Sequence, residues 1–480
     1  MLLLLADGLL LVALVTAPLL YGAVGFFSLL FLACLSVLIF NLVYLTRPWT
    51  LTEALRSPGA WLGIGLLLFI VAQLIPLPEE VIRKISPAAY QFYATYFPGG
   101  IDTGKTFTLS VYPSDTFLGL IQFLTYGLFF LSVLMRLVSD PSGKKEIHPV
   151  SHKKSEFLKL GCLTGVLSLL FHSLYDFNLH IPANGIYFVV LLALGVGTAG
   201  KKAYDHAFFR RMVGFVINFG FLVALFAIIQ KFSYNGRIFW VGMEAPNPIG
   251  SYYNYDHYAG FMELCGAAAI GMTVASIFHT SFFHRRGLIE KVLWFSTKEA
   301  NKALRYLLMS VVMVATIFMS TSRGGIMSFA LSQIIFFAVV LGAAWRTRKK
   351  ARSVGILTAI ILLIAVMVIW LGPKEFLERF RLLFIQNVIQ MEGPIGVRLL
   401  FYKGAFAVIK DFPWVGTGFN TFGTNFTRYR IFDYTNDYLR YTHNDYLQLI
   451  SEAGAAGILF LAGFLIFFLA AMVRVARRLE

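Results

Sequence analysis

The chain has 480 residues, of which 58% are hydrophobic and only 14% charged, and its formal net charge is +16. Soluble domains carry about 25% charged residues, so this composition excludes an ordinary soluble protein. The basic residues lie in short segments between apolar runs, which is where the positive-inside bias of membrane proteins places them, and this argues against a nucleic-acid partner. Cys34, Cys162 and Cys265 lie inside apolar runs, and their spacing indicates neither a disulfide framework nor a metal site.

Apolar runs long enough to cross a bilayer recur along the whole chain. They predict an all-α integral membrane protein with about twelve transmembrane helices. The N-terminal sequence MLLLLADGLLLVALV has no basic start and no cleavage site after it, so we expect a first membrane helix rather than a signal peptide. The runs lie at residues 2–20, 22–45, 60–77, 117–137, 158–177, 185–199, 212–230, 257–279, 305–321, 325–344, 354–371 and 456–473.

Basic residues follow every second apolar run. Cytoplasmic loops carry the excess of Lys and Arg, so we expect these segments and both termini inside, and the loops 78–116, 231–254 and 372–455 outside. The basic segments hold Arg47 and Arg56; Lys144, Lys145, Lys153, Lys154 and Lys159; Lys201, Lys202, Arg210 and Arg211; Arg285, Arg286, Lys291, Lys298, Lys302 and Arg305; residues 346–352; and Arg474, Arg477 and Arg478.

This alternation divides the chain into five segments. We expect N-terminal membrane helices, a cytoplasmic linker with a membrane hairpin, central membrane helices, a large outer loop with part of the active site, and a last membrane helix with a basic tail. In chain order these are residues 1–138, 139–211, 212–371, 372–455 and 456–480. Within the second segment, the polar sequence HSLYDFNLHIPAN at 172–184 separates two short apolar runs, which form either a full hairpin or a re-entrant one.

Arg323 lies in the sequence STSRGG, at the predicted outer end of the run 305–321. Only three residues separate this run from the next, so the place is either a tight turn or a break in one helix. A charge at membrane depth commonly marks function, and the glycines after it let a backbone or ligand approach closely. Its guanidinium is suited to bidentate binding of a phosphate. The alternative is an arginine that extends to the interface and caps a helix end.

Arg398 stands near the start of a predicted helix at 396–411, which Asp411, Pro413 and Gly416 bring to an end. We expect this amphipathic helix to lie on the bilayer or on the membrane helices. Arg398 would face a pyrophosphate there, assisted by the partial positive charge of the helix N-terminus. A solvated surface arginine is the alternative.

His443 lies in the sequence YTHNDYLQLISEAGAAG, where Thr442 or Asn444 is a suitable cap for a following helix. His443 is then exposed at the helix start and suited to act as a general base or to orient an acceptor hydroxyl. In a second interpretation His443, Asp445 and Glu452 are metal ligands, although their spacing matches no metal motif. In a third, the histidine only caps the helix.

The sequence GSYYNYDHYAGFMEL at 250–264 places Asn254, Asp256 and His257 where an outer loop enters a helix. Its four tyrosines form either an aromatic shelf for sugar rings or an interfacial belt. They are Tyr252, Tyr253, Tyr255 and Tyr258.

With these residues in view, the chain resembles the O-antigen ligase and polymerase family of bacterial envelope enzymes. The matching stretches are YYNYDHYAGFME, TSRGG, Arg398 with FPWVGTGFNTF, and THNDYLQLISEAGAAG, which together cover roughly residues 230–475; LSVYPSDT at 109–116 also looks like the family. The resemblance implies a GT-C-like architecture with many membrane helices and one large periplasmic loop. It places the protein in the bacterial inner membrane.

The resemblance implies a metal-independent, inverting glycosyltransferase without a cofactor. Its donor is a glycan on undecaprenyl diphosphate, and the acceptor is the lipid A core for a ligase. Two arginines hold the diphosphate and a loop histidine activates the acceptor, roles that fall on Arg323, Arg398 and His443. The expected substrate-binding set is Arg323, Arg398, His257, Asn254, Asn444 and Glu452.

Three alternatives remain at this stage. Polymerases extend another lipid-linked glycan and close relatives glycosylate proteins, both with the same kind of donor. A lipid-linked glycan transporter is the alternative from another class, although the chain shows no internal two-fold repeat and no charged residues in the middle of several spans, where a transport path would need them. One feature departs from the family pattern: residues 172–195 resemble a segment expected after the large loop, yet here they precede it, and their role is open.

Overall fold

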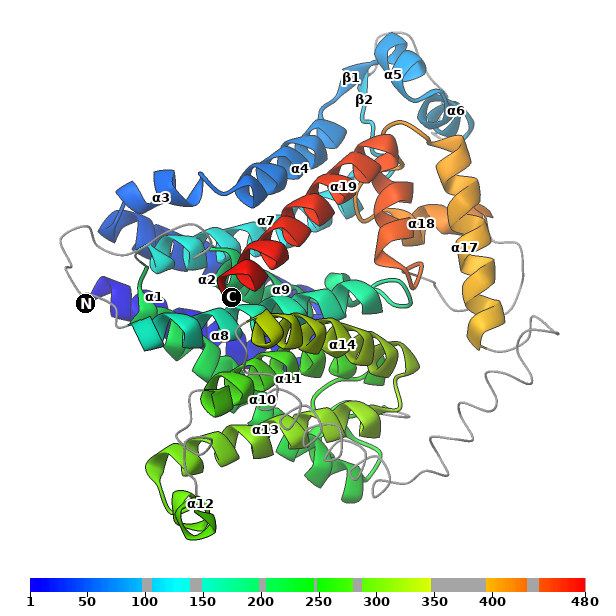
Figure 1. The fold of residues 1–480 in the computed structure, drawn as a ribbon. Coiled ribbons are helices and arrows are strands. Elements are labelled where there is room, and N and C mark those ends of the chain that lie inside the picture. The colour runs from blue at the N-terminus through cyan, green and yellow to red at the C-terminus, as the bar shows by residue number, and fades with distance from the viewer. Residues whose placement is uncertain are drawn as a thin grey trace.

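A computed structural model of the protein describes residues 1–96, 106–138, 149–197, 204–245, 248–278, 287–346, 394–429 and 440–479. Long helices run side by side through most of the molecule (Figure 1). Within the described residues, eight of them are long and apolar enough to cross a membrane. They are α1 (Leu2–Leu19), α2 (Phe26–Thr46), α7 (Pro113–Leu137), α10 (His206–Phe232), α11 (Tyr255–Phe278), α13 (Lys298–Ser320), α14 (Arg323–Arg346) and α19 (Asp445–Leu479).

Three further helices correspond to predicted spans. The helices α4 (Pro58–Leu74) and α9 (Pro182–Val196) are apolar but shorter, and α8 (Pro149–His172) carries several charges before its apolar part. The predicted span 354–371 and the basic segment 347–352 lie outside the described residues. The prediction of an all-α integral membrane protein is confirmed, and the described helices follow the predicted runs in order.

Short elements lie between the long helices. The single two-stranded sheet of the described residues pairs Leu77 with Phe107 and Pro78 with Thr106 in antiparallel register. The remaining elements are η1 (Tyr21–Ala23), α3 (Trp49–Ala54), β1 (Leu77–Pro78), α5 (Glu79–Ile85), α6 (Pro87–Tyr96), β2 (Thr106–Phe107), η2 (Asn178–His180), η3 (Ile238–Trp240), α12 (Leu288–Trp294), α17 (Pro394–Asp411), α18 (Phe422–Phe426) and η5 (Thr427–Tyr429).

The hairpin of α8 and α9 lies inside the bundle, where α8 packs against α9, α11, α14 and α19. Small residues allow the closest of these contacts, because an ideal Cβ on Gly161 would lie 2.9 Å from the Cα of Gly271. Such close backbone approach is a usual basis of helix association in membranes. The hairpin therefore forms part of the core, and its turn at 173–181 reaches the end of the bundle that carries the predicted outer loops, which we term the outer end.

The outer end is covered by a cap made from two distant parts of the chain (Figure 1). Val408 and Phe412 of α17 share a buried apolar cluster with Ile82, Tyr93 and Phe107 of the 78–116 region. A second cluster joins α17 to α18 and contains Phe401, Ala405, Phe422 and Phe426. The predicted amphipathic helix thus exists, and its apolar face is buried against α18 and the 78–116 region.

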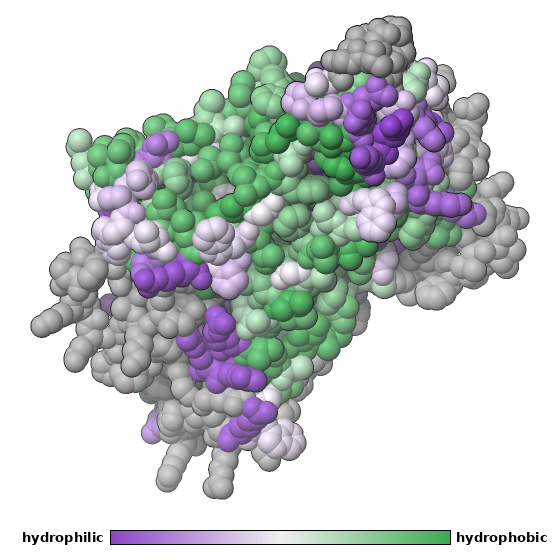
Figure 2. Space-filling view, turned by 90° about the horizontal axis from the view of Figure 1, so that it is seen from above, coloured by the Kyte–Doolittle hydropathy of each residue, from purple (hydrophilic) through white to green (hydrophobic). Residues whose placement is uncertain are grey.

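Two backbone features place the start of α14 and the end of the loop. Thr321 adopts a left-handed conformation (φ 57°) after α13, so α13 and α14 are separate helices joined by a tight turn. Gly454 breaks the helical geometry of α19 (φ 58°, ψ −142°), so its first turns lie in the cap and the remainder runs along the bundle. Figure 2 shows a broad hydrophobic surface between hydrophilic patches at the two ends.

Candidate functional site

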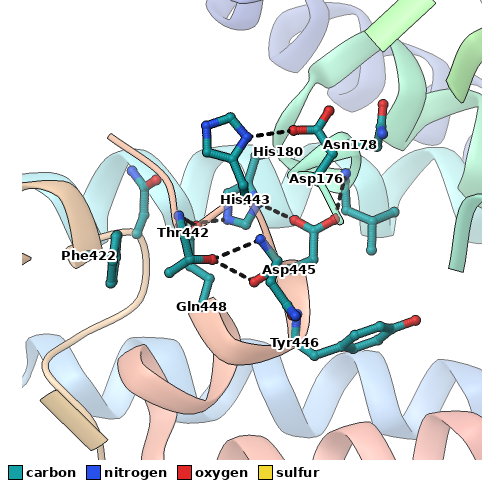
Figure 3. Close-up of polar contacts among 12 residues, drawn as sticks. Asp176, Asn178, His180, Phe422, Thr442, His443, Asp445, Tyr446 and Gln448 are labelled. Carbon is teal, nitrogen blue, oxygen red and sulfur yellow. Dashed lines mark hydrogen bonds and ion pairs between the residues drawn. The ribbon is translucent and has the colours of Figure 1, made fainter. Parts of the chain in front are cut away.

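Two pairs of ionisable side chains join the 173–181 turn to the start of α19. His443 Nδ1 lies 3.0 Å from Asp176 Oδ1, and His180 Nδ1 lies 2.7 Å from Asp445 Oδ1. Each segment thus supplies one histidine and one carboxylate (Figure 3). The backbone reinforces the junction, because Asp445 N–H donates to the carbonyl of Ser173 at 2.9 Å. This reciprocal pairing fixes His443 against the turn.

The imidazole of His443 is held on three sides. The Phe177 ring meets it edge-on at 4.8 Å, and the Phe401 ring stacks on it at 5.8 Å between ring centroids. Asp176 accepts from Nδ1, so the second ring nitrogen, Nε2, is the one left for a substrate proton. Within the described residues Nε2 has no hydrogen-bond partner, and the side chain remains 27% exposed. The backbone of His443 is left-handed (φ 55°), a strained conformation of the kind that clusters at functional sites.

Asp176 is buried and lies between two histidines. His257 Nε2 is 3.7 Å from Asp176 Oδ2, on the opposite side of the carboxylate from His443. Burial opposes ionisation of this carboxyl, but the hydrogen bond from His443 and the charge of His257 outweigh it and hold the pKa of Asp176 well below its usual value. Asp176 is therefore an ionised acceptor that selects which nitrogen of His443 carries the proton.

Arg398 belongs to the same site through Asp256, the second residue of α11. Arg398 Nη2 lies 3.7 Å from Asp256 Oδ2, and the hydroxyl of Ser322 donates to Asp256 Oδ1 at 2.5 Å. One turn after Arg398, the hydroxyl of Tyr402 donates to the backbone carbonyl of His443 at 3.2 Å. The Asp256 carboxylate thus links α17 to the α13–α14 turn beside His443.

Arg323 is the first residue of α14 and directly follows Ser322. The next two glycines have a packing reason. An ideal Cβ on Gly324 would lie 3.0 Å from the His172 ring, and one on Gly325 would lie 2.7 Å from Ala259 Cβ. Beneath them, His172 Nδ1 is 2.8 Å from Glu263 Oε1, a pair that is fully buried. The expected close approach at these glycines is therefore made by α8 and α11.

Asn444 and Asn254, two of the predicted substrate-binding residues, accept hydrogen bonds from backbone N–H groups at helix starts. Asn444 caps α19, because its Oδ1 accepts from the N–H groups of Tyr446 and Leu447, each at 3.0 Å. Asn254 likewise accepts from the N–H of Asp256 at the start of α11, at 2.8 Å. These two side chains position the helices that carry Asp445 and Asp256.

Glu452 is fully buried and holds the sequence WVGTGFNTF in place. Its carboxylate accepts from the backbone N–H of Asn420 at 2.7 Å and of Phe422 at 3.2 Å. Gln73 of α4 completes the contact, since its side-chain amide donates to the carbonyls of Val415 and Glu452, both at 2.9 Å. In this structure Glu452 therefore acts on the loop backbone.

The tyrosines of 250–264 do not act as one surface. Tyr252 and Tyr258 are buried in the core, and Tyr253 is 48% exposed.

The three residues of the metal-site interpretation each contact a different partner. His443 pairs with Asp176, Asp445 with His180, and Glu452 with loop amides. Within the described residues, no group of three His, Cys, Asp or Glu side chains is placed to hold a metal ion.

The 172–184 segment has a place in the site that its sequence alone does not reveal. It supplies Asp176, His180 and the buried His172 to the site, although Asp176 and His443 are 267 positions apart in the chain. A polar HxxxDxxxH spacing between two apolar runs was the available signal. It indicated an unusual turn but not what the turn would contact.

The fold and the site define a multi-pass membrane protein with a polar, partly enclosed site at one end of its helix bundle. Residues 308–462, about a third of the chain, match the family model described as O-antigen ligase, and this region holds Arg323, Arg398 and His443. This match agrees with the resemblance to the O-antigen ligase and polymerase family over that part of the chain. No curated protein and no solved structure matches the chain.

Proposed function

We propose that the protein transfers a glycan from undecaprenyl diphosphate to the lipid A core, as an O-antigen ligase of the bacterial inner membrane with its site on the periplasmic face. The observation that carries the proposal is the meeting of Arg398, the α14 start and His443 at one end of the bundle, inside a region that matches the ligase family. Lipid-linked glycans and acceptors are the general partners of this family.

The reaction is a single displacement at the anomeric carbon of the first sugar. The acceptor hydroxyl forms the new C–O bond while its proton passes to Nε2 of His443, which Asp176 holds in the required tautomer. The bond between the sugar and the diphosphate breaks, and the electron pair leaves with the diphosphate. Attack from the opposite side inverts the anomeric configuration. This route uses no metal ion and no cofactor.

Arg323 and Arg398 would stabilise the negative charge that grows on the leaving diphosphate. A preorganised hydrogen-bond donor at such a position commonly lowers the activation free energy by about 3–4 kcal/mol. Asp256 orients Arg398 before substrate binds, at 3.7 Å from Oδ2 to Nη2, so the guanidinium need not be ordered during the reaction. The donor diphosphate would compete for this guanidinium, which is 30% exposed.

The test uses Arg323→Ala, Arg398→Ala and His443→Ala in a strain whose own gene is deleted. Each variant is expected to lose glycan transfer while its amount in the membrane stays normal. Near wild-type transfer by His443→Ala would refute the assigned role. Inhibition of the purified enzyme by a chelator would refute the metal-independent route.

The deletion phenotype distinguishes the related activities. Loss of all long glycan from lipid A, with accumulation of donor, is the ligase result. Chains of a single repeat identify a polymerase, and loss of glycan from proteins identifies a protein glycosyltransferase. Movement of lipid-linked glycan across reconstituted vesicles without transfer would instead identify a transporter.

A further inference from the structure

An apolar cavity borders the 173–181 turn at Leu179 and His180, and Arg398 does not line it. Its volume is about 290 Å³, and α4, α7, α9 and α19 form its walls. Most of the lining is aromatic or aliphatic and includes Phe123, Phe130, Phe188, Phe460, Phe464 and Phe467. Interiors of folded proteins are otherwise closely packed, so an apolar space of this size among membrane helices is suited to a hydrocarbon chain.

The cavity ends at the site. His180, Asp445 and Glu452 line it, together with Asn420 and Gln122, whose side-chain amide donates to the carbonyl of His180 at 3.0 Å. A second hollow of about 920 Å³ adjoins it, with Leu62, Phe460 and Phe467 common to both linings. A chain that entered beside His180 would therefore have room to extend along α4 and α19.

The charges at the cavity's polar end do not suit a diphosphate. Two carboxylates, Asp445 and Glu452, line it together with His180, which is already paired with Asp445, and within the described residues no lysine or arginine does. Arg398 instead pairs with Asp256, and neither residue lines the cavity. Carboxylate and amide groups are good partners for sugar hydroxyls. The cavity thus fits a lipid with a hydroxyl-rich head rather than the diphosphate-bearing donor.

We infer that this cavity binds one hydrocarbon chain of the acceptor lipid and so brings the acceptor's sugar to His443 from the side opposite the donor. The geometry supports two separate approaches. His443 bonds to Asp176 at one end of the turn, while Asp445, two residues later, bonds to His180 at the other end and lines the cavity. This inference rests on the proposed function and adds where the acceptor's lipid part is held.

Two glycines allow the cavity to be filled without disturbing its walls. Gly63 of α4 and Gly127 of α7 line it, and an ideal Cβ on either would have no atom within 4 Å. Leucine is a better helix former than glycine, so Gly63→Leu and Gly127→Leu are expected to fold. The matched controls are Gly214→Leu and Gly342→Leu, at helical glycines that also have no atom within 4 Å and do not line the cavity.

The purified full-length protein is assayed with one donor and two acceptors, the lipid A–core glycolipid and the core oligosaccharide released from it. Gly127→Leu is expected to lower transfer to the glycolipid at least tenfold, with transfer to the oligosaccharide within twofold of wild type and an unchanged KM for the donor. The two control variants should match wild type on both acceptors. Equal losses of transfer to both acceptors, with a raised KM for the donor, would show that the cavity binds the donor. No loss of transfer to either acceptor would show that the cavity holds only bulk membrane lipid. Both results overturn the inference.

A second measurement does not depend on activity, and it decides the question if the wild type transfers glycan to neither acceptor. A photo-crosslinking amino acid in place of Leu66, which lines the cavity, is expected to label the acceptor glycolipid, and excess unlabelled glycolipid should prevent it. The same group at Leu222, which is 60% exposed on α10, should label bulk lipid without competition. Labelling of phospholipid alone at Leu66 overturns the inference, whereas absent transfer with specific labelling refutes only the proposed reaction.

Discussion

At the scale of single residues, the contact that matters most is the one between Asp176 and His443. The carboxylate is buried, its Oδ1 is 3.0 Å from His443 Nδ1, and its pKa is held low by that hydrogen bond and by His257 despite burial. The pair resembles the carboxylate–histidine arrangement of other enzymes, in which the carboxylate orients the base and does not itself take the proton.

Asp176→Asn is expected to lower kcat by a factor on the order of 10²–10⁴, because an amide NH₂ facing Nδ1 favours the wrong tautomer. The KM for the donor should change little, since Asp176 does not reach the arginines. Asp176→Glu should restore part of the activity. A purely structural role would instead lower the amount of folded protein in both variants, which size-exclusion chromatography of the purified proteins would reveal.

Residue types and short motifs single out Arg323, Arg398 and His443 in the sequence as candidate site residues. The motifs supply an isolated arginine before two glycines, an arginine at a helix start and a histidine before a helix cap. Asp176 could not be paired with His443 in the same way, because the contact spans 267 positions and depends on where the α8–α9 hairpin packs. Glu452 was expected to bind substrate, yet its buried carboxylate contacts loop amides. Only the position of 420–422 in space reveals that contact.

At the scale of elements, the WVGTGFNTF loop and the kink of α19 fit together through glycine. Gly416 has φ 68°, and an ideal Cβ there would lie 2.1 Å from the backbone carbonyl carbon of Glu452. Gly454 makes the reciprocal contact with the backbone of Trp414 at 2.6 Å. At both positions the nearest atoms belong to the backbone, so no side chain could move away to make room for a Cβ. The packing of the cap therefore requires glycine at both positions.

Gly416→Ala is therefore expected to prevent stable folding of the cap and to reduce sharply the protein recovered from membranes. Gly236→Ala is the matched control. Gly236 also has a positive φ (95°), but an ideal Cβ there has no atom within 4 Å. The control should show only the strain of a left-handed alanine, about 1–2 kcal/mol. Equal yields and melting temperatures for the two variants would contradict the close packing.

The His180–Asp445 pair ties the hairpin turn to α19 and should do so in a pH-dependent way. Burial lowers the pKa of His180, but the hydrogen bond and charge of Asp445 outweigh it and raise that pKa above its usual value. A raised folded-state pKa means that the stabilisation is complete below about pH 6.5 and is lost as pH rises through the folded-state value.

His180→Gln should therefore melt below the wild type at about pH 6, and the difference should shrink as the pH is raised above the ordinary histidine range. Thermal unfolding of the purified proteins in one detergent measures this. Asp445→Asn should show the same convergence, because it removes the other partner of the 2.7 Å contact. A difference in melting temperature that stays constant with pH would mean that the charge of His180 does not contribute to the stability of the folded protein.

Element boundaries were largely accessible from the sequence, for physical reasons. The apolar run 305–321 and the next one correspond to α13 and α14, and the predicted helix at 396–411 corresponds to α17 (Pro394–Asp411). Apolar length and Pro or Gly at the ends fix such helices locally. Burial of the α8–α9 hairpin between α11 and α19 is a property of packing between distant segments, and no local pattern encodes it.

At the scale of the whole molecule, the chain is asymmetric between its two ends. The cap, with α17 and α18, lies at one end of the bundle, and α12 lies far from it (Figure 1). The helix α11 starts in the site, where Asp256 lies, and Ile277 near its other end packs against Trp294 of α12. The basic residues that give the chain its net charge of +16 gather in the segments after every second span.

The positive-inside bias predicts that α12 is cytoplasmic and the cap periplasmic. Trp414 of the cap is 67% exposed and Ile289 of α12 is 76% exposed, so a cysteine at either position should react with a maleimide. The background is Cys34→Ser, because Cys162 and Cys265 are buried. In spheroplasts, a membrane-impermeant maleimide should label Trp414→Cys at once and Ile289→Cys only after the membrane is permeabilised. The reverse pattern would place Arg398 and His443 on the cytoplasmic side, where a periplasmic transfer to lipid A could not occur, so this one measurement tests the orientation on which the proposed function depends.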